Sequence, residues 1–225
     1  SMVGLKKLGY HVELACAPSG KLIDKSNENG IYVNFINHFR QKISPISDLL
    51  AIHELYNVIK KKKFQIIHTH NSKAGFLGRV AGLLANCPII IHTCHGFAFH
   101  DEENCLKRYL FILLEKIAAK WTHFIIFISE PLIIWAKKYK IKPRLGQKKI
   151  YSGIDLKEFT ADKTDAGIIR AKYGFNKDDF LIGFVSKLLE GKGHEYAIRA
   201  MVSLRESVKN AKLVIVGEGY LQTRI

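Results

Sequence analysis

Short apolar segments alternate with longer amphipathic segments along most of the chain. The apolar segments are rich in β-branched and aromatic residues, as in 64–69, 88–93 and 123–129, and each precedes a stretch with helical spacing of its apolar positions. Residues 44–64 show that spacing clearly, with Pro45 near the start. The alternation predicts an α/β fold: a parallel sheet of strands apolar on both faces, covered by helices on both sides.

The expected strands are residues 10–17, 31–36, 64–69, 88–93, 123–129 and 148–152, and the expected helices are 44–64, 72–85, 104–121 and 130–139. The pattern changes after residue 159. Residues 160–178 are polar and suit a linker, and a new β-α-β unit follows, with strands at 180–186 and 211–219 around a helix at 194–208. One such unit cannot bury both faces of its sheet, so we expect two Rossmann-like domains: 1–159, whose first, central strand would precede residue 1, and 179–225, the start of a second.

The charge balance points to an anionic partner. Lys and Arg number 35 against 20 Asp and Glu, a net charge of +15, and such a field attracts nucleic acid, phosphorylated substrates or an anionic bilayer. No RNP-like pattern or zinc finger supports the nucleic-acid alternative. The basic stretches 59–64 and 135–149 suit an anionic lipid surface, with Trp135 and Tyr139 at the interface; a solvated helix end is the alternative.

Cysteine usage and hydropathy indicate a cytoplasmic protein. The four Cys show no Cys-x-x-Cys pairing. No segment reaches the roughly 18 apolar residues of a spanning helix, because Ser129, Glu130 and Pro131 interrupt the longest apolar stretch.

The stretch "HTHNSKAG" (68–75) leads from a strand into a helix that begins at about Ser72. Ligands of open α/β sheets lie beyond the carboxyl ends of the strands, and the free N–H groups of a helix start favour anions. His70, Asn71, Ser72 and Lys73 are therefore candidate contacts. The alternative is that Asn71 or Ser72 only caps the helix.

The stretch "HTCHGFAFH" (92–100) repeats this construction at the end of the next strand. Its possible zinc ligands are His92, Cys94, His95 and His100. Strand alternation places His92 and Cys94 on one face and His95 on the other, and the spacing matches no ordinary zinc motif, so we expect no metal. His95 is the predicted ligand contact, and Gly96 would let a ligand approach the backbone closely.

A third stretch, 184–198, places Lys187 and Lys192 between a strand and a helix opened by Gly193. Two ammonium groups beside free helix-start amides can hold a diphosphate. The pattern is neither a P-loop nor a dinucleotide fingerprint. Two solvated loop lysines are the alternative.

Taken together, residues 66–82, 89–100, 148–159 and 191–221 resemble the family 4 retaining glycosyltransferases of the GT-B fold, closest to bacterial members that build capsule, exopolysaccharide or lipid-linked oligosaccharide. The resemblance implies an N-terminal domain (1–159) for the acceptor, a linker (160–178) and a C-terminal domain (from 179) for a nucleotide sugar, facing each other across a cleft. It implies a hexose transferred with retention from a nucleoside-diphosphate sugar, a UDP-sugar being favoured over a GDP-sugar, with no other cofactor.

By position, the resemblance makes His95 the active-site histidine and assigns donor binding to Gly96, Lys187, Lys192 and Gly193. It places His70, Asn71, Ser72, Lys73 and His100 on the acceptor side of the cleft. Ser152 stands where the family usually has Asn, and Lys187 stands where it has Arg, which gives up bidentate geometry.

The family's glycine-rich first loop would precede residue 1 and its acidic E-x7-E segment would follow residue 225, so the resemblance implies weak donor binding and little turnover for this chain alone. The expected partners are the nucleotide sugar, a saccharide or lipid-linked acceptor and an anionic membrane surface, with the protein peripheral on the inner face of the cytoplasmic membrane. A non-enzymatic basic α/β module that binds anionic lipid or nucleic acid is the competing hypothesis.

Overall fold

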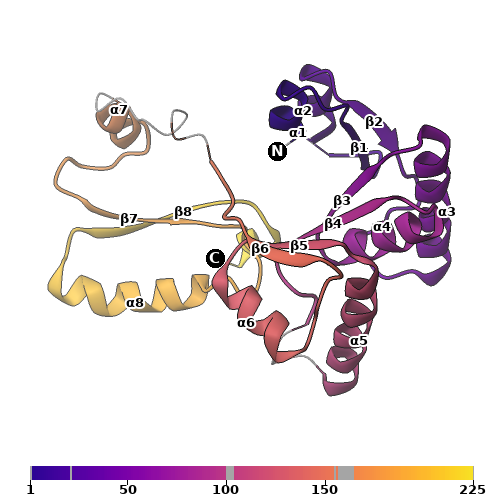
Figure 1. Cartoon of the computed structure of the whole chain (residues 1–225). Helices are drawn as coiled ribbons and strands as arrows, with labels where there is room; N and C mark the ends of the chain where they lie inside the picture. The colour runs from indigo at the N-terminus through magenta and orange to yellow at the C-terminus, as the bar shows by residue number, and fades with distance from the viewer. Residues whose placement is uncertain (1, 21, 100–103, 155, 157–164, 225) are drawn as a thin grey trace. The chain divides into compact units, whose positions relative to one another are not determined.

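The computed structural model describes residues 2–20, 22–99, 104–154, 156 and 165–224 (Figure 1). The chain forms two compact units, Ser1–Gly153 and Ile154–Ile225. Each unit is described by itself.

The elements of the first unit are α1 (Met2–Lys7), β1 (Glu13–Cys16), α2 (Leu22–Glu28), β2 (Tyr32–Phe35), α3 (Pro45–Lys62), β3 (Ile66–His70), α4 (Ser72–Leu84), β4 (Ile89–Cys94), α5 (Cys105–Trp121), β5 (Phe124–Phe127), α6 (Glu130–Lys138) and β6 (Gly146–Lys149). The second unit contains α7 (Asp165–Lys172), β7 (Phe180–Val185), α8 (His194–Ser207), β8 (Ala211–Val216) and a short 3-10 helix, η2 (Tyr220–Thr223). Among these helices none is long and apolar enough to cross a bilayer.

All strand pairs of the described residues are parallel. In the first unit β3, β4, β5 and β6 form one sheet in chain order, and β1 and β2 form a separate pair; in the second unit β7 pairs with β8. The predicted α/β class with parallel sheets is therefore confirmed. The β3–β4 register sets His70 opposite Thr93, so these strands end side by side.

The two faces of the four-stranded sheet differ in burial. Helices pack on one face, where Ile90, Ile125 and Phe127 are at most 2% exposed. On the other face Ile66 is 46% exposed and Phe124 is 42% exposed. The prediction of helices on both sides is thus wrong for the described residues. A parallel sheet is normally covered on both faces, so this face has room for a further layer.

Two apolar clusters form the core on the covered side. One joins α3 and α4 to the loop after β2, through Leu55, Leu77 and Ile36. The other is aromatic and joins α5 and α6 to the segment after β4, where the rings of Phe97 and Trp135 stack with centroids 6.5 Å apart. Both clusters anchor segments that lead away from the ends of β3 and β4.

Helix α4 lies unusually close to the strands beneath it, because glycines face the sheet. An ideal Cβ at Gly75 would lie 2.5 Å from His92 Cε1, and one at Gly78 would lie 2.7 Å from Thr69 Cγ2. One at Gly82 would lie 2.9 Å from the end of Ile67. A Cβ at any of the three would force the facing side chain or the helix to shift, so these glycines allow the helix to lie this close to the sheet.

The predicted boundaries hold for most elements, and Pro45 begins α3 as expected. Two differences stand out. Helix α2 was not predicted, because its sequence "LIDKSNE" is short and mostly polar. Strand β6 is Gly146–Lys149 rather than 148–152. Within the segment predicted as a linker that is helical at best, Asp165–Lys172 forms a helix.

Candidate functional site

In the first unit, histidines gather where β3 and β4 end. The ring nitrogens of His70 (Nδ1) and His95 (Nε2) lie 3.1 Å apart, although the two residues are 25 positions apart in the chain. The ring of His68 lies 4.4 Å from that of His70, and its Nε2 lies 2.7 Å from Thr93 Oγ1. Both His70 and His95 are exposed. The parallel register thus brings together two of the predicted contacts.

Two histidines at the end of β3, His68 and His70, have lowered pKa values. Desolvation, reinforced by the proximity of His70 and His95, lowers the pKa of His68 to about 4, although part of the residue remains exposed. The pKa of His70 is also lowered, first by desolvation and then by His95. The contact between His70 Nδ1 and His95 Nε2 uses one nitrogen of each ring, so each ring keeps its other nitrogen available for a ligand.

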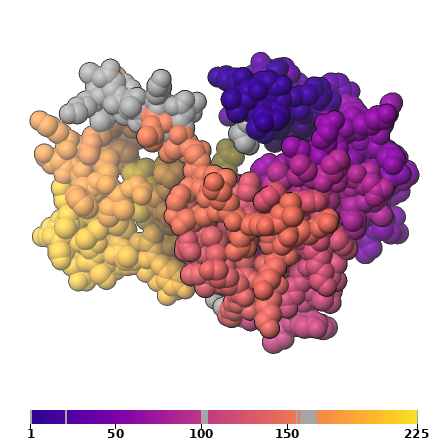
Figure 2. Space-filling model, viewed as in Figure 1, coloured from indigo at the N-terminus to yellow at the C-terminus, as the bar shows by residue number. Residues whose placement is uncertain are grey.

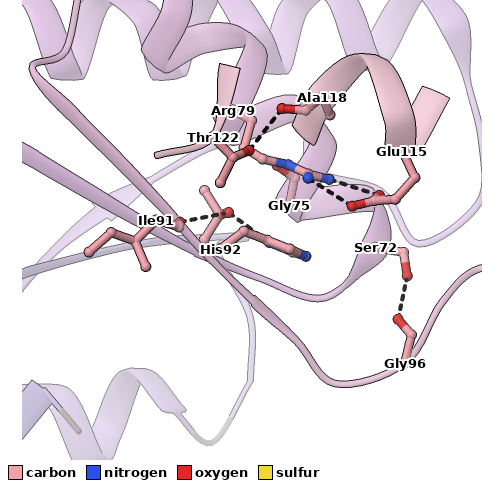
Figure 3. Close-up of polar contacts among 10 residues, drawn as sticks. Ser72, Gly75, Arg79, Ile91, His92, Gly96, Glu115, Ala118 and Thr122 are labelled. Atoms are coloured by element: carbon pink, nitrogen blue, oxygen red, sulfur yellow. Dashed lines mark hydrogen bonds and ion pairs between the residues drawn. The ribbon is translucent and has the colours of Figure 1, made fainter. Parts of the chain in front are cut away.

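At the start of α4, neither of the two residues considered as helix caps, Asn71 and Ser72, has that role. Asn71 makes no side-chain capping hydrogen bond, and its φ of 63° with a ψ of 161° is a strained backbone conformation that residues other than glycine rarely adopt. The Ser72 hydroxyl donates instead to the carbonyl oxygen of Gly96, at 3.2 Å (Figure 3). This bond ties the β3–α4 loop to the β4 loop. Beside Gly96 the space that a Cβ would enter is open.

Lys73 is turned toward α3. Its ammonium lies 2.7 Å from Asp48 Oδ1, which neutralises much of the charge expected for an anion at the helix start. A groove of about 310 Å³ lies beside it. The lining residues are Ala17, Phe39, Arg40, Gln41, Asn71, Lys73 and Ala74. Arg40 was not predicted as a contact, because an isolated exposed arginine in a loop has no sequence signal.

A buried ion pair stiffens the scaffold beneath the histidines. Arg79 of α4 is fully buried and donates through both terminal nitrogens to the Glu115 carboxylate of α5, at 2.8 and 2.9 Å (Figure 3). Its Nε donates to the carbonyl oxygen of Gly75, at 3.0 Å. The pair is bidentate and joins two helices on the covered face of the sheet. It was missed because Arg79 and Glu115 are ordinary helix residues in the sequence.

His92 and Cys94 lie on the covered face and are withdrawn from the site. The Thr69 hydroxyl lies 2.9 Å from His92 Nδ1. Burial, followed by the Arg79 charge, lowers the pKa of His92 to about 2. Burial raises the pKa of the Cys94 thiol to about 12. Both side chains are therefore uncharged packing groups.

Two of the sequence-based predictions concern metal coordination and His100. Within the residues that the structure describes, no three His, Cys, Asp or Glu side chains converge as metal ligands would. His100, predicted on the acceptor side, lies outside the described residues.

In the second unit, the loop between β7 and α8 carries both predicted lysines. Lys187 and Lys192 are exposed and form no ion pair in the described part of the chain. Gly193 precedes α8 with a φ of 83°, which glycine adopts without strain. The unpaired N–H groups of the first turn of α8 follow at once. Lys192 and Gly193 therefore adjoin a helix start, and Lys187 follows the end of β7.

Two features that hold this loop escaped the sequence analysis. His194 is 3% exposed, and its Nε2 lies 2.8 Å from Ser186 Oγ. The loop after β8 passes so close to the β7–α8 loop that an ideal Cβ at Gly217 would lie 1.8 Å from the carbonyl oxygen of Ser186. An ideal Cβ at Gly219 would lie 2.2 Å from the carbonyl oxygen of Leu188. The two glycines of "GEG" at 217–219 are the sequence feature that could have indicated this close approach of two backbone segments.

Comparison with models of known protein families identifies the family of this chain. The model of the family described as Glycosyltransferase Family 4 matches residues 2–158, more than half of the chain. The chain belongs to glycosyltransferase family 4. The model described as Glycosyl transferases group 1 matches residues 165–225. The family predicted from the motifs is thereby confirmed.

Two curated relatives are bacterial glycosyltransferases by name. The UDP-Gal:alpha-D-GlcNAc-diphosphoundecaprenol alpha-1,3-galactosyltransferase of Escherichia coli is 32% identical over 216 residues, which cover 94% of this chain and 55% of the relative. The capsular polysaccharide biosynthesis glycosyltransferase CapM of Staphylococcus aureus is 28% identical over 220 residues, which cover 95% and 55%. The chain thus spans about half the length of these relatives.

Solved structures confirm the GT-B expectation for the fold. Anabaena Alr3699/HepE in complex with UDP-glucose matches with a TM-score of 0.74 at 17% identity, over 93% of this chain and 54% of that chain. The sucrose-phosphate synthase of Thermosynechococcus elongatus matches with a TM-score of 0.67 at 16% identity, over 96% and 54%. At such identities the likeness concerns the fold.

Proposed function

We propose that this chain carries the acceptor-binding part and the beginning of the donor-binding part of a glycosyltransferase. The reaction moves a hexose from a nucleoside-diphosphate sugar, preferably a UDP-sugar, to a lipid-linked saccharide acceptor, with retention of the anomeric configuration. The observation that carries the proposal is the meeting of His70 and His95 at adjacent strand ends, 3.1 Å apart, in a family 4 chain. The names of the Escherichia coli relative and the Anabaena complex support a UDP-sugar.

The roles follow from the chemistry of each group. His95 contacts the donor sugar and its phosphates through the ring nitrogen that His70 leaves available. Lys187, Lys192 and the amides at the start of α8 hold the diphosphate, and their positive charge stabilises it as it departs. Gly96 leaves open space for the sugar. The groove that contains Arg40 and Asn71 accommodates part of the acceptor.

Donor binding is tested by ligand-observed NMR of this chain with UDP, GDP, UDP-galactose and UDP-glucose in the presence of a chelator. Saturation transfer to the uridine nucleotides is expected, with loss in Lys192→Ala. Lys209→Ala is the matched control, because Lys209 is equally exposed and lies before β8 rather than at the β7–α8 loop. Equal binding by Lys192→Ala and the wild-type chain would remove the diphosphate role.

Transfer is tested in the full-length gene product with His95→Ala. Removing a group that stabilises developing charge slows an enzyme by about a hundredfold or more, and we expect a loss of that size in the rate of sugar transfer. His53→Ala is the control, because His53 is an exposed histidine of α3. Unchanged transfer by the His95 variant would contradict the assignment.

A further inference from the structure

The second unit, orange to yellow in Figure 2, has few buried side chains, and one of them is a histidine. Among the described residues of this unit, only Asp179, Leu188, His194 and Ala211 are buried. Leu188 and Ala211 are apolar, and the carboxylate of Asp179 is paired with Lys212. His194 is 3% exposed. Its place in so small a core therefore needs a separate explanation.

The ring of His194 joins the start of α8 to the end of β7. Its Nε2 lies 2.8 Å from Oγ of Ser186, the residue that follows β7. His194 itself is the first residue of α8. The ring also packs against Phe184, with the two centroids 4.8 Å apart. The contact with Ser186 thus closes the β7–α8 loop at its base.

The direction of this hydrogen bond follows from the second contact of Ser186. The hydroxyl of Ser186 donates to the carbonyl oxygen of Lys187, at 3.3 Å. Because a hydroxyl has only one proton to donate, Nε2 of His194 is the donor in the contact with Ser186. The bonds therefore run from the ring through Ser186 to the backbone of Lys187, one of the two lysines proposed to hold the diphosphate.

The other ring nitrogen has no partner. Nδ1 of His194 is buried and forms no hydrogen bond within the part of the chain that the structure describes. A buried polar atom without a partner lowers stability, and native cores contain few of them. A leucine would fill a similar volume without any polar atom. Packing alone therefore does not favour a histidine at this position.

The contact fixes the two lysines of the loop relative to each other. Lys187 directly follows Ser186, and Lys192 lies two positions before His194. A backbone bond from the amide of Ser186 to the carbonyl oxygen of Val216, at 3.1 Å, holds the Lys187 side of the loop. The bond from His194 to Ser186 ties the Lys192 side to it.

We propose that His194 is a positioning residue for the diphosphate of the nucleotide sugar. Acting through Ser186, it keeps Lys187 and Lys192 close enough together to bind one anion along with the free amides of the α8 start. The unpaired Nδ1 is the loss of stability that accompanies this arrangement, as is common at functional sites. The inference rests on the proposed function, because it requires that the β7–α8 loop binds a diphosphate.

The test measures the dissociation constants of UDP and of uridine for the full-length gene product by titration calorimetry. His194→Leu keeps the bulk of the side chain and removes the bond, so UDP should bind about tenfold more weakly, as for the loss of one hydrogen bond. Uridine has no phosphate and should bind as before. His194→Gln should restore UDP affinity to within about twofold, because its amide can donate from the position of Nε2. Ser203→Ala, in the same helix, is the control and should change neither constant.

Hydrogen exchange of the β7 and β8 amides separates positioning from packing. His194→Leu removes the unpaired Nδ1, so exchange should stay the same or become slower although UDP binds more weakly. Ser186→Ala leaves both ring nitrogens without partners, so exchange should accelerate and UDP affinity should fall as in the leucine variant. His194→Leu/Ser186→Ala should lower UDP affinity no further than either single variant, because both break the same bond.

Three results would overturn the proposal. Equal UDP affinity in His194→Leu and the wild-type protein would mean that the ring only packs. Equal losses for UDP and uridine would mean that His194 maintains the whole unit rather than the diphosphate contacts. Additive losses in the double variant would mean that His194 and Ser186 act separately. In each case the wild-type protein still binds UDP, so the proposed function stands; a wild-type protein that does not bind UDP would refute both.

Discussion

The two loop regions that we propose as ligand contacts are held by different means. In the first unit, side chains fix the ends of β3 and β4: the Arg79–Glu115 pair, the Thr69–His92 contact and the bond from Ser72 to Gly96. In the second unit, backbone lies directly on backbone where Gly217 crosses Ser186. The comparison teaches that charge and pH should act on the first loop in particular, whereas the second should respond mainly to steric bulk.

The largest effect is expected from breaking the buried ion pair. Arg79→Met leaves the Glu115 carboxylate buried without its partner, and such a loss destabilises a protein by about 3–5 kcal/mol. Arg79→Met/Glu115→Leu should recover most of the free energy of unfolding, since apolar replacements remove both charges. Urea unfolding followed by the fluorescence of Trp121 and Trp135, both in the first unit, measures the change. A double variant as unstable as the single one would show that the pair is not the cause.

A smaller effect, confined to the second unit, is expected for Gly217→Ala. The added methyl would meet the carbonyl oxygen of Ser186, and overpacking against backbone costs about 1–3 kcal/mol. Hydrogen exchange of the β7 and β8 amides should accelerate, while the fluorescence transition of the first unit stays in place. Gly183→Ala is the matched control, because a Cβ at that strand position meets nothing within 4 Å. Similar exchange in the two variants would refute the steric account.

The pH dependence should belong to the first unit. His92 has a folded pKa of about 2, below its ordinary value, so the unfolded chain binds the proton first as pH falls below about 6.5. Stability is therefore full above about pH 6.5 and declines toward pH 2, by at most about 1.4 kcal/mol per pH unit for one histidine. Urea midpoints at pH 7, 6 and 5 measure the slope. His68, whose pKa is lowered to about 4, contributes a similar slope in this range, so His92→Gln should remove only about half of it. An unchanged slope would exclude His92 as a source.

Much of this molecule could be predicted because its signals are local. Strand ends followed by helix starts placed His70 and His95 at one edge, and the parallel register did bring them to 3.1 Å. The Arg79–Glu115 pair could not be found that way, because it depends on how α4 and α5 pack, 36 positions apart. Burial of both faces of the sheet was overestimated for a related reason. Apolar residues on a strand indicate that a face of the sheet will be buried, but they do not indicate which segment buries it.

The glycines of α4 couple the packing of the whole helix to the position of its first residues. Gly82 lies at the far end of α4 from Ser72, and it allows the helix to rest within van der Waals reach of Ile67 and Ile90. A Cβ there would lie 2.9 Å from Ile67 Cδ1 and 3.2 Å from Ile90 Cδ1, so either these side-chain ends or the helix would have to shift. A shift of the helix would move Asn71 and Ser72 relative to Gly96. Tolerance to substitution should therefore follow the underside of this helix rather than distance from the histidines. A variant with every ligand contact intact could still lose the site through a change nearly three helical turns away.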